Sequence, residues 1–262
     1  MLNYKSTGQG VKKIIFVHGN SQSAEYWDQI LNQSVLSDQW TLIAVDLPGH
    51  GKSFRSSDPE KDYSMKGMAN HLREFLAHFE QEEYVLVGNS FGTNLIGEIA
   101  LELRNCKGIM LTAADIIGKG LSTAEIIQPN PNVLACFIAE PSQEQIDSLV
   151  SDAVWNLSEE LMARMKIIFR HTDPAFRLQI ADSIGRAEYS DEILNLENSK
   201  LPVCVLFGEK EKLIFPDYLD KINFKYWRNK TIIIKDSGHC SQLDQPIILA
   251  EHIREFAIDC LK

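Results

Sequence analysis

Ser90 is the residue of this sequence whose surroundings most strongly suggest chemistry. It lies between two glycines in the segment GNSFG, residues 88–92. An apolar run precedes this segment and an amphipathic pattern follows it, which predicts a strand, a sharp turn and a helix. A serine at such a turn is presented for nucleophilic attack. Alternatively, Ser90 is only a small residue in a tight turn, so the interpretation depends on whether the chain supplies partners for it.

A serine hydroxyl is a weak nucleophile, so it needs a base, and the base needs an acid that orients it. His239 is the candidate base, because it follows the last predicted strand in the segment SGHCSQLDQP, residues 237–246. The candidate acids follow the penultimate predicted strand, and they are Glu209, Glu211 and Asp217. Cys240, next to His239, is interpreted as an ordinary thiol, because Ser90 already fills the role of nucleophile.

A carbonyl under attack also needs two donors for its developing negative charge. The turn at His18-Gly19 follows the first predicted strand and could direct the backbone amide of Asn20 into the site. The amide of Phe91, at the start of the helix after Ser90, would be the second donor. No histidine pair has the spacing of a metal site, so we expect no metal and no cofactor.

Alternating strands and helices would position these residues. The predicted strands are residues 13–17, 40–45, 84–87, 107–111, 202–207 and 231–234. Helical patterns lie at residues 24–32, at 63–79, after Ser90, and from 246 to about 261. This order predicts an α/β fold with a mostly parallel sheet and helices on both faces.

The alternation breaks between residues 118 and 199, where no strand pattern occurs. Prolines separate helical patterns there at residues 123–127, 133–139, 143–154, 158–169 and 175–186. We therefore expect a core domain of residues 1–117 and 200–262, with residues 118–199 as a helical insertion that covers the ligand-binding edge of the sheet. Its apolar side chains, which could contact a substrate, include Phe137, Met165, Ile168 and Phe169.

Composition excludes several classes of function. The chain has 262 residues and a formal net charge of −10, which argues against nucleic acid as a partner. It contains no run of about 18 apolar residues, so we expect no membrane span, and its N-terminus lacks the apolar stretch of a signal peptide. Five scattered cysteines fit reduced thiols, and the expected location is the cytoplasm.

Five segments together resemble the α/β-hydrolase family. They are HGN (18–20), DLPGHGKS (46–53), GNSFG (88–92), FGEKEKLIFP (207–216) and SGHCSQLDQP (237–246). The resemblance implies an α/β-hydrolase fold with Ser90 as nucleophile, His239 as base and the amides of Asn20 and Phe91 as oxyanion hole. It also implies that residues 118–199 are the family's cap.

The sequence departs from the family pattern at three places. Members of this type usually carry Asp three residues after the glycine that ends the penultimate strand, where Glu211 stands here. Some members place the acid after the preceding strand instead, which makes Asp115 a rival to Glu211. Thr93 replaces a glycine that many members have after the nucleophile elbow, the strand–turn–helix that carries Ser90. The short N-terminus suggests that an early edge strand is missing.

The resulting expectation is a serine hydrolase that cleaves a small-molecule carboxylic ester or thioester through an acyl-enzyme, with Glu211 as the acid that orients His239. The serine at the elbow argues against the dehalogenase and epoxide-hydrolase branches, which need a carboxylate there. GNSFG also resembles the elbow of carbon–carbon bond hydrolases, although the chain lacks their glycine-rich oxyanion loop. A ligand-binding or receptor protein with slow turnover, or a lyase or synthase, is a further alternative. The substrate and the oligomeric state are left open.

Overall fold

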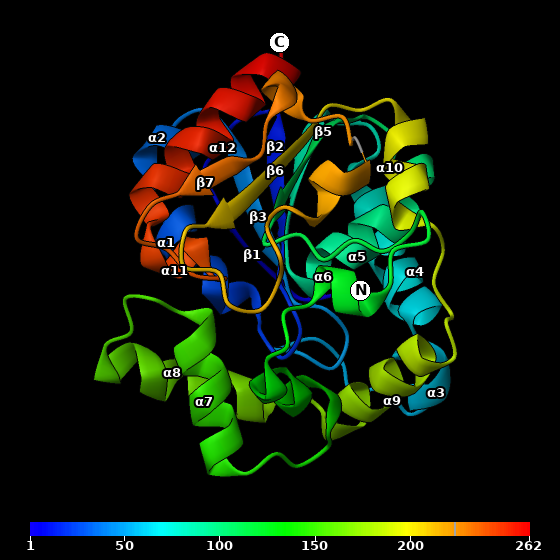
Figure 1. Cartoon of the computed structure of the whole chain (residues 1–262). Coiled ribbons are helices and arrows are strands. Elements are labelled where there is room, and N and C mark those ends of the chain that lie inside the picture. The colour runs from blue at the N-terminus through cyan, green and yellow to red at the C-terminus, as the bar shows by residue number, and fades with distance from the viewer. Residues whose placement is uncertain (223) are drawn as a thin grey trace.

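A seven-stranded sheet forms the centre of the computed structural model, which describes residues 1–222 and 224–262 (Figure 1). The strands are β1 (Tyr4–Thr7), β2 (Lys13–Val17), β3 (Thr41–Val45), β4 (Tyr84–Asn89), β5 (Cys106–Thr112), β6 (Val203–Gly208) and β7 (Ile232–Ile234). Their spatial order is β1-β3-β2-β4-β5-β6-β7. β1 pairs antiparallel with β3, and the other neighbouring strands pair in parallel.

Helices connect the strands and cover both sides of the sheet (Figure 1). The α-helices are α1 (Asp28–Leu31), α2 (Ser34–Ser37), α3 (Pro59–Asp62), α4 (Met65–Leu76), α5 (Phe91–Ile99), α6 (Thr123–Ile126), α7 (Gln143–Ala153), α8 (Glu159–His171), α9 (Pro174–Gly185), α10 (Glu192–Ser199), α11 (Ser241–Asp244) and α12 (Pro246–Cys260). The short 3₁₀ helices are η1 (Ala24–Trp27), η2 (Ala77–Phe79), η3 (Ala100–Glu102), η4 (Pro131–Phe137), η5 (Tyr218–Ile222) and η6 (Trp227–Asn229). The predicted fold class is confirmed.

Both faces of the sheet are buried because successive residues of each central strand enter different hydrophobic clusters. In β2, Ile14 and Phe16 join one cluster, whereas Ile15 and Val17 join the other. Apolar residues of α1, α2 and α12 complete the first cluster, and those of α4, α5 and α10 belong to the second. This burial explains why the central strands are nearly continuous apolar runs in the sequence.

The segment between β5 and β6 is helical. Its elements η4, α7, α8 and α9 lie beyond the end of the sheet at which β4 leads into Ser90 (Figure 1). Side-chain caps explain where these helices begin: Ser142 forms a capping box with Gln145 at α7, Ser158 caps α8, and Asp173 caps α9 just before Pro174. The division of the chain into a core and a cap stays a prediction.

Two elements differ from the sequence-based expectation. The suggestion that the early edge strand is missing is wrong, because Tyr4–Thr7 pairs with β3. Helix α10 was not predicted, and it returns to the sheet and packs against α5. At this contact Gly97 allows a close approach, since a Cβ on it would lie 2.6 Å from the Cβ of Glu192. None of the helices in residues 1–222 and 224–262 combines the length and apolar character needed to cross a membrane.

Candidate active site

Ser90 joins β4 to α5 in a strained backbone conformation. Its φ of 50° and ψ of −129° lie where residues with a side chain are rarely found. Its amide donates a hydrogen bond to the carbonyl of Thr112 (3.0 Å). Gly92 permits α5 to come close to β2, because a Cβ there would lie 2.7 Å from the carbonyl oxygens of Val17 and His18. The turn therefore holds Ser90 half-buried at the edge of a cavity.

His239 and Glu211 form a buried pair beside this cavity. The Nδ1 atom of His239 lies 2.9 Å from Oε2 and 3.1 Å from Oε1 of Glu211. The carboxylate is fixed in turn, because Oε1 accepts hydrogen bonds from the amides of Leu213 (2.8 Å) and Ile214 (3.3 Å). With the Nδ1 hydrogen directed at Glu211, the Nε2 atom of His239 is left free to accept a proton.

The charge of Glu211 changes the basicity of His239. Burial by itself lowers the pKa of the His239 ring, but the negative charge and hydrogen bond of Glu211 oppose it, with a further contribution from Asp115. The net effect raises the pKa of His239 above its ordinary value of 6.5. The ring is therefore a stronger base than a free histidine.

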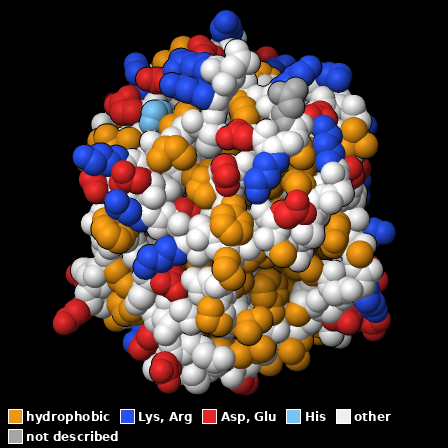
Figure 2. All heavy atoms as spheres, in the orientation of Figure 1, with side chains coloured by type: hydrophobic (Ala, Val, Ile, Leu, Met, Phe, Trp, Pro, Cys, Tyr) orange, Lys and Arg blue, Asp and Glu red, His pale blue; other side chains and the backbone are white. Residues whose placement is uncertain are grey.

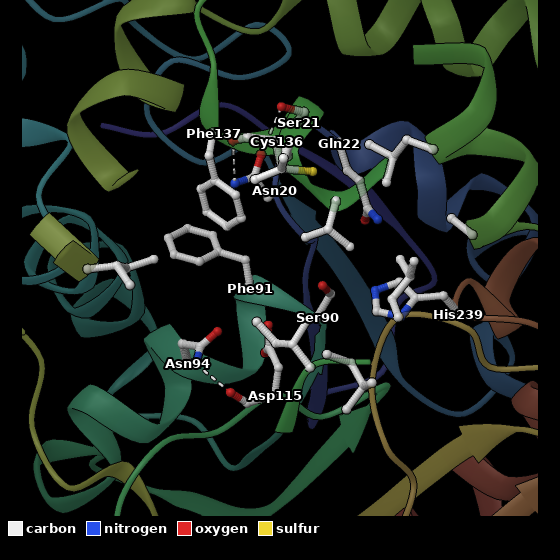
Figure 3. Close-up of a pocket in the computed structure, with 18 of the residues that line it drawn as sticks. Asn20, Ser21, Gln22, Ser90, Phe91, Asn94, Asp115, Cys136, Phe137 and His239 are labelled. Atoms are coloured by element: carbon white, nitrogen blue, oxygen red, sulfur yellow. Dashed lines mark hydrogen bonds between the residues drawn. The ribbon is translucent and has the colours of Figure 1, made fainter. Parts of the chain in front are cut away.

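Ser90 and His239 line the same cavity. Figure 3 shows Ser90 between Phe91 and the ring of His239. Among the described residues, no hydrogen bond joins the Ser90 hydroxyl to this ring. Such contacts are often long in a protein without substrate and shorten when substrate binds.

The other candidate acids lie elsewhere. Glu209 is exposed and pairs with Lys210 (3.1 Å), and Asp217 is also exposed. Asp115 lines the cavity, where its Oδ1 atom accepts a hydrogen bond from the Thr93 hydroxyl (2.9 Å). Burial raises the pKa of Asp115 to about 6. Within the described chain, Glu211 is the one of these four carboxylates that is hydrogen-bonded to His239.

The two predicted oxyanion donors lie next to Ser90. Asn20 and Phe91 both line the cavity, and Phe91 is the first residue of α5. A Cβ on Gly19 would lie 3.1 Å from the Cβ of Ser90, so the loop after β2 passes directly beside the serine. Neither the Asn20 nor the Phe91 backbone amide forms a hydrogen bond within residues 1–222 and 224–262, which leaves both amides available to a ligand.

The loop that carries Asn20 is attached to the helical segment. The side-chain amide of Asn20 donates to the carbonyl of Cys136 (3.2 Å), and its Oδ1 accepts from the Ser21 hydroxyl (2.8 Å). Arg177 of α9, which is 2% exposed, donates to the same Ser21 hydroxyl (3.4 Å). Ser21 has a positive φ of 56°, so these contacts hold a strained residue directly after Asn20.

Arg177 also binds the segment after η4. Its guanidinium donates to the carbonyls of Ile138 (3.0 Å), Ala139 (2.8 Å) and Phe169 (3.3 Å), and it lies over the Phe169 ring at 4.9 Å. No carboxylate lies within ion-pair distance of Arg177 in the part of the chain that the structure describes. Sequence reasoning missed this residue, because nothing in its own segment indicates that Arg177 is buried.

His18 and His50 lie behind the same loop and are neutral. Burial lowers the pKa of both rings. The amide of Leu47 donates to Nε2 of His18 (3.0 Å), and the amide of Ser21 donates to Nε2 of His50 (3.3 Å). These two rings therefore hold the loops that follow β2 and β3.

Two further polar residues hold the loop that carries His239. The Asn89 side chain, immediately before Ser90, donates to the carbonyl of His239 (3.2 Å). Asp244 accepts hydrogen bonds from the amides of Gly238 (2.8 Å) and Trp155 (3.1 Å). The sequence could have indicated the role of Asn89, since it is a polar residue at the buried end of an apolar strand. Nothing in the sequence around Asp244 indicates that it holds this loop.

The cavity over Ser90 has a volume of about 450 Å³ and a mostly apolar lining. Figure 2 shows a hollow with hydrophobic side chains on the face occupied by the helical segment in Figure 1. Of the four apolar residues expected there, Phe137 and Phe169 line the cavity, whereas Met165 and Ile168 are buried but do not reach it. A serine, a base with its acid and two free amides around such a cavity could carry out acyl transfer.

The sequence matches one protein family over most of its length. Residues 12–246 match the family described as alpha/beta hydrolase fold. Among curated proteins, the chain is 29% identical over 259 residues to the dihydrolipoyllysine-residue acetyltransferase component of the acetoin cleaving system of Cupriavidus necator. That alignment covers 93% of this chain and 63% of the relative, so the chain spans less than two thirds of the relative's length.

Two other comparisons cover nearly the whole chain. The pimeloyl-[acyl-carrier protein] methyl ester esterase of Wigglesworthia glossinidia brevipalpis is 22% identical over 267 residues, covering 97% of this chain and 96% of that protein. A crystal structure of a variant N-acyl homoserine lactonase, complexed with N-hexanoyl homoserine lactone, superposes with a TM-score of 0.89 at 23% identity. The superposition covers 99% of this chain and 94% of the lactonase chain, and the likeness establishes the shared fold.

Proposed function

The chain belongs to the α/β hydrolase fold family, and from this premise we propose that it is a serine hydrolase that cleaves a carboxylic ester or thioester. The observation that most supports the proposal is the buried pair of His239 and Glu211 beside the strained Ser90. A turn needed only for packing would not require a neighbouring histidine whose pKa is raised by a carboxylate.

The proposed reaction has two steps. The Oγ atom of Ser90 attacks the acyl carbonyl, while Nε2 of His239 takes the hydroxyl proton and Glu211 stabilises the charged ring. The amides of Asn20 and Phe91 donate to the oxyanion, and His239 then protonates the leaving alcohol or thiol. In the second step His239 takes a proton from water, which attacks the acyl-enzyme. His239 then returns the proton to Oγ of Ser90 as the Ser90–acyl bond breaks and the acid leaves.

We further propose that residues 118–199 form a cap over a core of residues 1–117 and 200–262. The support is that Phe137 and Phe169 line the same cavity as Ser90. A volume of about 450 Å³ suits a small molecule with an apolar acyl chain. If the cap shapes the substrate site, Phe137→Ala should shift the preferred acyl chain length, whereas Leu178→Ala, on an exposed part of α9, should not.

Esters are the first substrates to test, because one curated relative is named as a methyl ester esterase. Initial rates on p-nitrophenyl esters from acetate to palmitate should show turnover that Ser90→Ala abolishes. Ser151→Ala, an exposed serine of α7, is the matched control and should retain full activity. Turnover that survives in Ser90→Ala would contradict the proposal. If the wild-type protein cleaves no ester, carbon–carbon bond cleavage and ligand binding with slow or no turnover become the leading candidates, ahead of a lyase or synthase.

A further inference from the structure

Asn94 presents an unpaired acceptor oxygen to the cavity. Its side-chain nitrogen donates to the backbone carbonyl of Asp115 (2.9 Å) and to Oε2 of Glu192 (3.0 Å). A carbonyl oxygen can only accept, so this contact fixes which end of the Asn94 amide carries the nitrogen. Its Oδ1 atom has no hydrogen-bond partner among the described residues, although Asn94 is only 3% exposed and lines the cavity.

Asp115 places a second acceptor on the same wall. Its Oδ1 atom is bound to the Thr93 hydroxyl, but Oδ2 has no partner within residues 1–222 and 224–262. Figure 3 shows Asn94 and Asp115 side by side below Phe91 and Ser90. No lysine or arginine is among the described residues that line the cavity. Since Glu211 holds His239, Asp115 is left without a role in the proposed proton transfers.

Two acceptors that have no partner among the described residues, on the wall of a mostly apolar cavity, favour a ligand that donates to them. We propose that Asn94 and Asp115 form an acceptor wall that selects esters carrying an N–H or O–H donor near the scissile carbonyl. The inference rests on the proposed function. The same wall disfavours a substrate carboxylate at this place, because Asp115 would repel it and Asn94 offers it no hydrogen.

A pair of matched esters tests the wall directly. The p-nitrophenyl esters of N-acetylglycine and of 4-oxopentanoic acid differ only by an N–H in place of a CH₂. Each kcat/KM value is divided by the rate constant for hydrolysis of the same ester by hydroxide. The normalised kcat/KM of the wild-type protein should be about tenfold higher for the N-acetylglycine ester. The p-nitrophenyl esters of 3-hydroxybutanoic and butanoic acid test in the same way whether an O–H donor is preferred. The p-nitrophenyl monoester of glutaric acid tests whether a carboxylate is rejected.

Variants of Asp115 test whether the acceptor wall causes the preference for esters with an N–H or O–H donor. Asp115→Ala should bring the ratio for the matched pair close to one, and Asp115→Asn should speed cleavage of the glutaric monoester. Asp217→Asn removes an exposed carboxylate and should leave every ratio unchanged. Thermal unfolding identifies a variant that does not fold. If Asp115→Ala is such a variant, Asp115→Asn carries the test through the glutaric monoester, because an amide removes the negative charge but keeps an acceptor oxygen.

The outcomes separate this inference from the proposed function. Equal normalised kcat/KM values for both matched pairs in the wild-type protein overturn the acceptor wall but leave the serine hydrolase intact. If no ester is cleaved, the proposed function fails, and the wall is tested by binding alone. Calorimetry on Ser90→Ala with N-acetylglycine methyl ester and methyl 4-oxopentanoate should then give about tenfold tighter binding of the first. Equal dissociation constants overturn the inference.

Discussion

Glu211 has one more methylene than the aspartate that the family resemblance led us to expect at this position, and its loop accommodates the difference. The amides of Leu213 and Ile214 bind one carboxylate oxygen, and His239 Nδ1 approaches both oxygens. The Glu211 side chain is fully buried. A carboxylate held in this way fixes the tautomer of His239 and stabilises its protonated form.

Removal of this charge should nearly abolish turnover. Glu211→Gln should lower kcat by about three to four orders of magnitude, because an amide no longer enforces the productive tautomer of His239. Glu209→Gln, on the exposed part of the same loop, is the control and should behave like the wild-type protein. A Glu211→Gln variant that keeps most of its turnover, together with an inactive Asp115→Asn variant, would transfer the role of acid to Asp115.

The raised pKa of His239 predicts how activity depends on pH. His239 acts as a base only when it is neutral, so kcat/KM should rise with pH through the pKa of its ring. Because this pKa lies above 6.5, the midpoint of the rise should also lie above pH 6.5. In Glu211→Gln, the residual activity should have its midpoint at a lower pH, since the charge that favours the protonated ring is gone. A midpoint that does not move would contradict the assignment.

The loop after β2 and the helix α9 are linked by contacts that serve the proposed oxyanion hole. Arg177 spans from the carbonyls of residues 138 and 139 to the Ser21 hydroxyl, and Asn20 reaches the carbonyl of Cys136. These bonds join the helical segment to the backbone whose amide would bind the oxyanion. The position of the helical segment and the geometry of the oxyanion donors are therefore coupled.

Arg177 should act as a positioning residue. Arg177→Met leaves several buried carbonyls unpaired, which should lower the free energy of unfolding by about 1–3 kcal/mol. If the contact with Ser21 positions the Asn20 amide, kcat should fall about tenfold while KM changes little. Arg177→Lys should restore part of kcat. Arg186→Met, at the exposed end of the same helix, is the control. An equally destabilised Arg177→Met variant with unchanged kcat would leave Arg177 a purely structural role.

The order of strands and helices follows from the sequence because both faces of the sheet are buried, which makes each central strand a distinct apolar run. The edge strand β1 could not be predicted in this way, since its residues YKST are mostly polar and half-exposed and form no apolar run. Helix α10 is short and carries mostly polar residues, so its packing on α5 has no clear periodic signal.

Candidate site residues could be named from their segments, but their contacts could not. The residue types alone left Glu209, Glu211 and Asp217 as candidates, and the resemblance to the family favoured Glu211 with Asp115 as its rival. Only the path of the loop decides which carboxylate reaches His239. Arg177 and Ser21 are 156 positions apart in the chain, and no local pattern links them. Such contacts depend on how the whole molecule brings distant segments together.

The most direct test of the whole account is covalent labelling of Ser90. A fluorophosphonate should inactivate the protein and add one phosphonyl group, which peptide mapping by mass spectrometry should locate on Ser90. Labelling should be absent in Ser90→Ala and slowed by orders of magnitude in His239→Ala, because the hydroxyl needs its base. A folded wild-type protein that takes no label at Ser90, or that is labelled elsewhere with full ester turnover, would contradict the claim that Ser90 is an activated nucleophile.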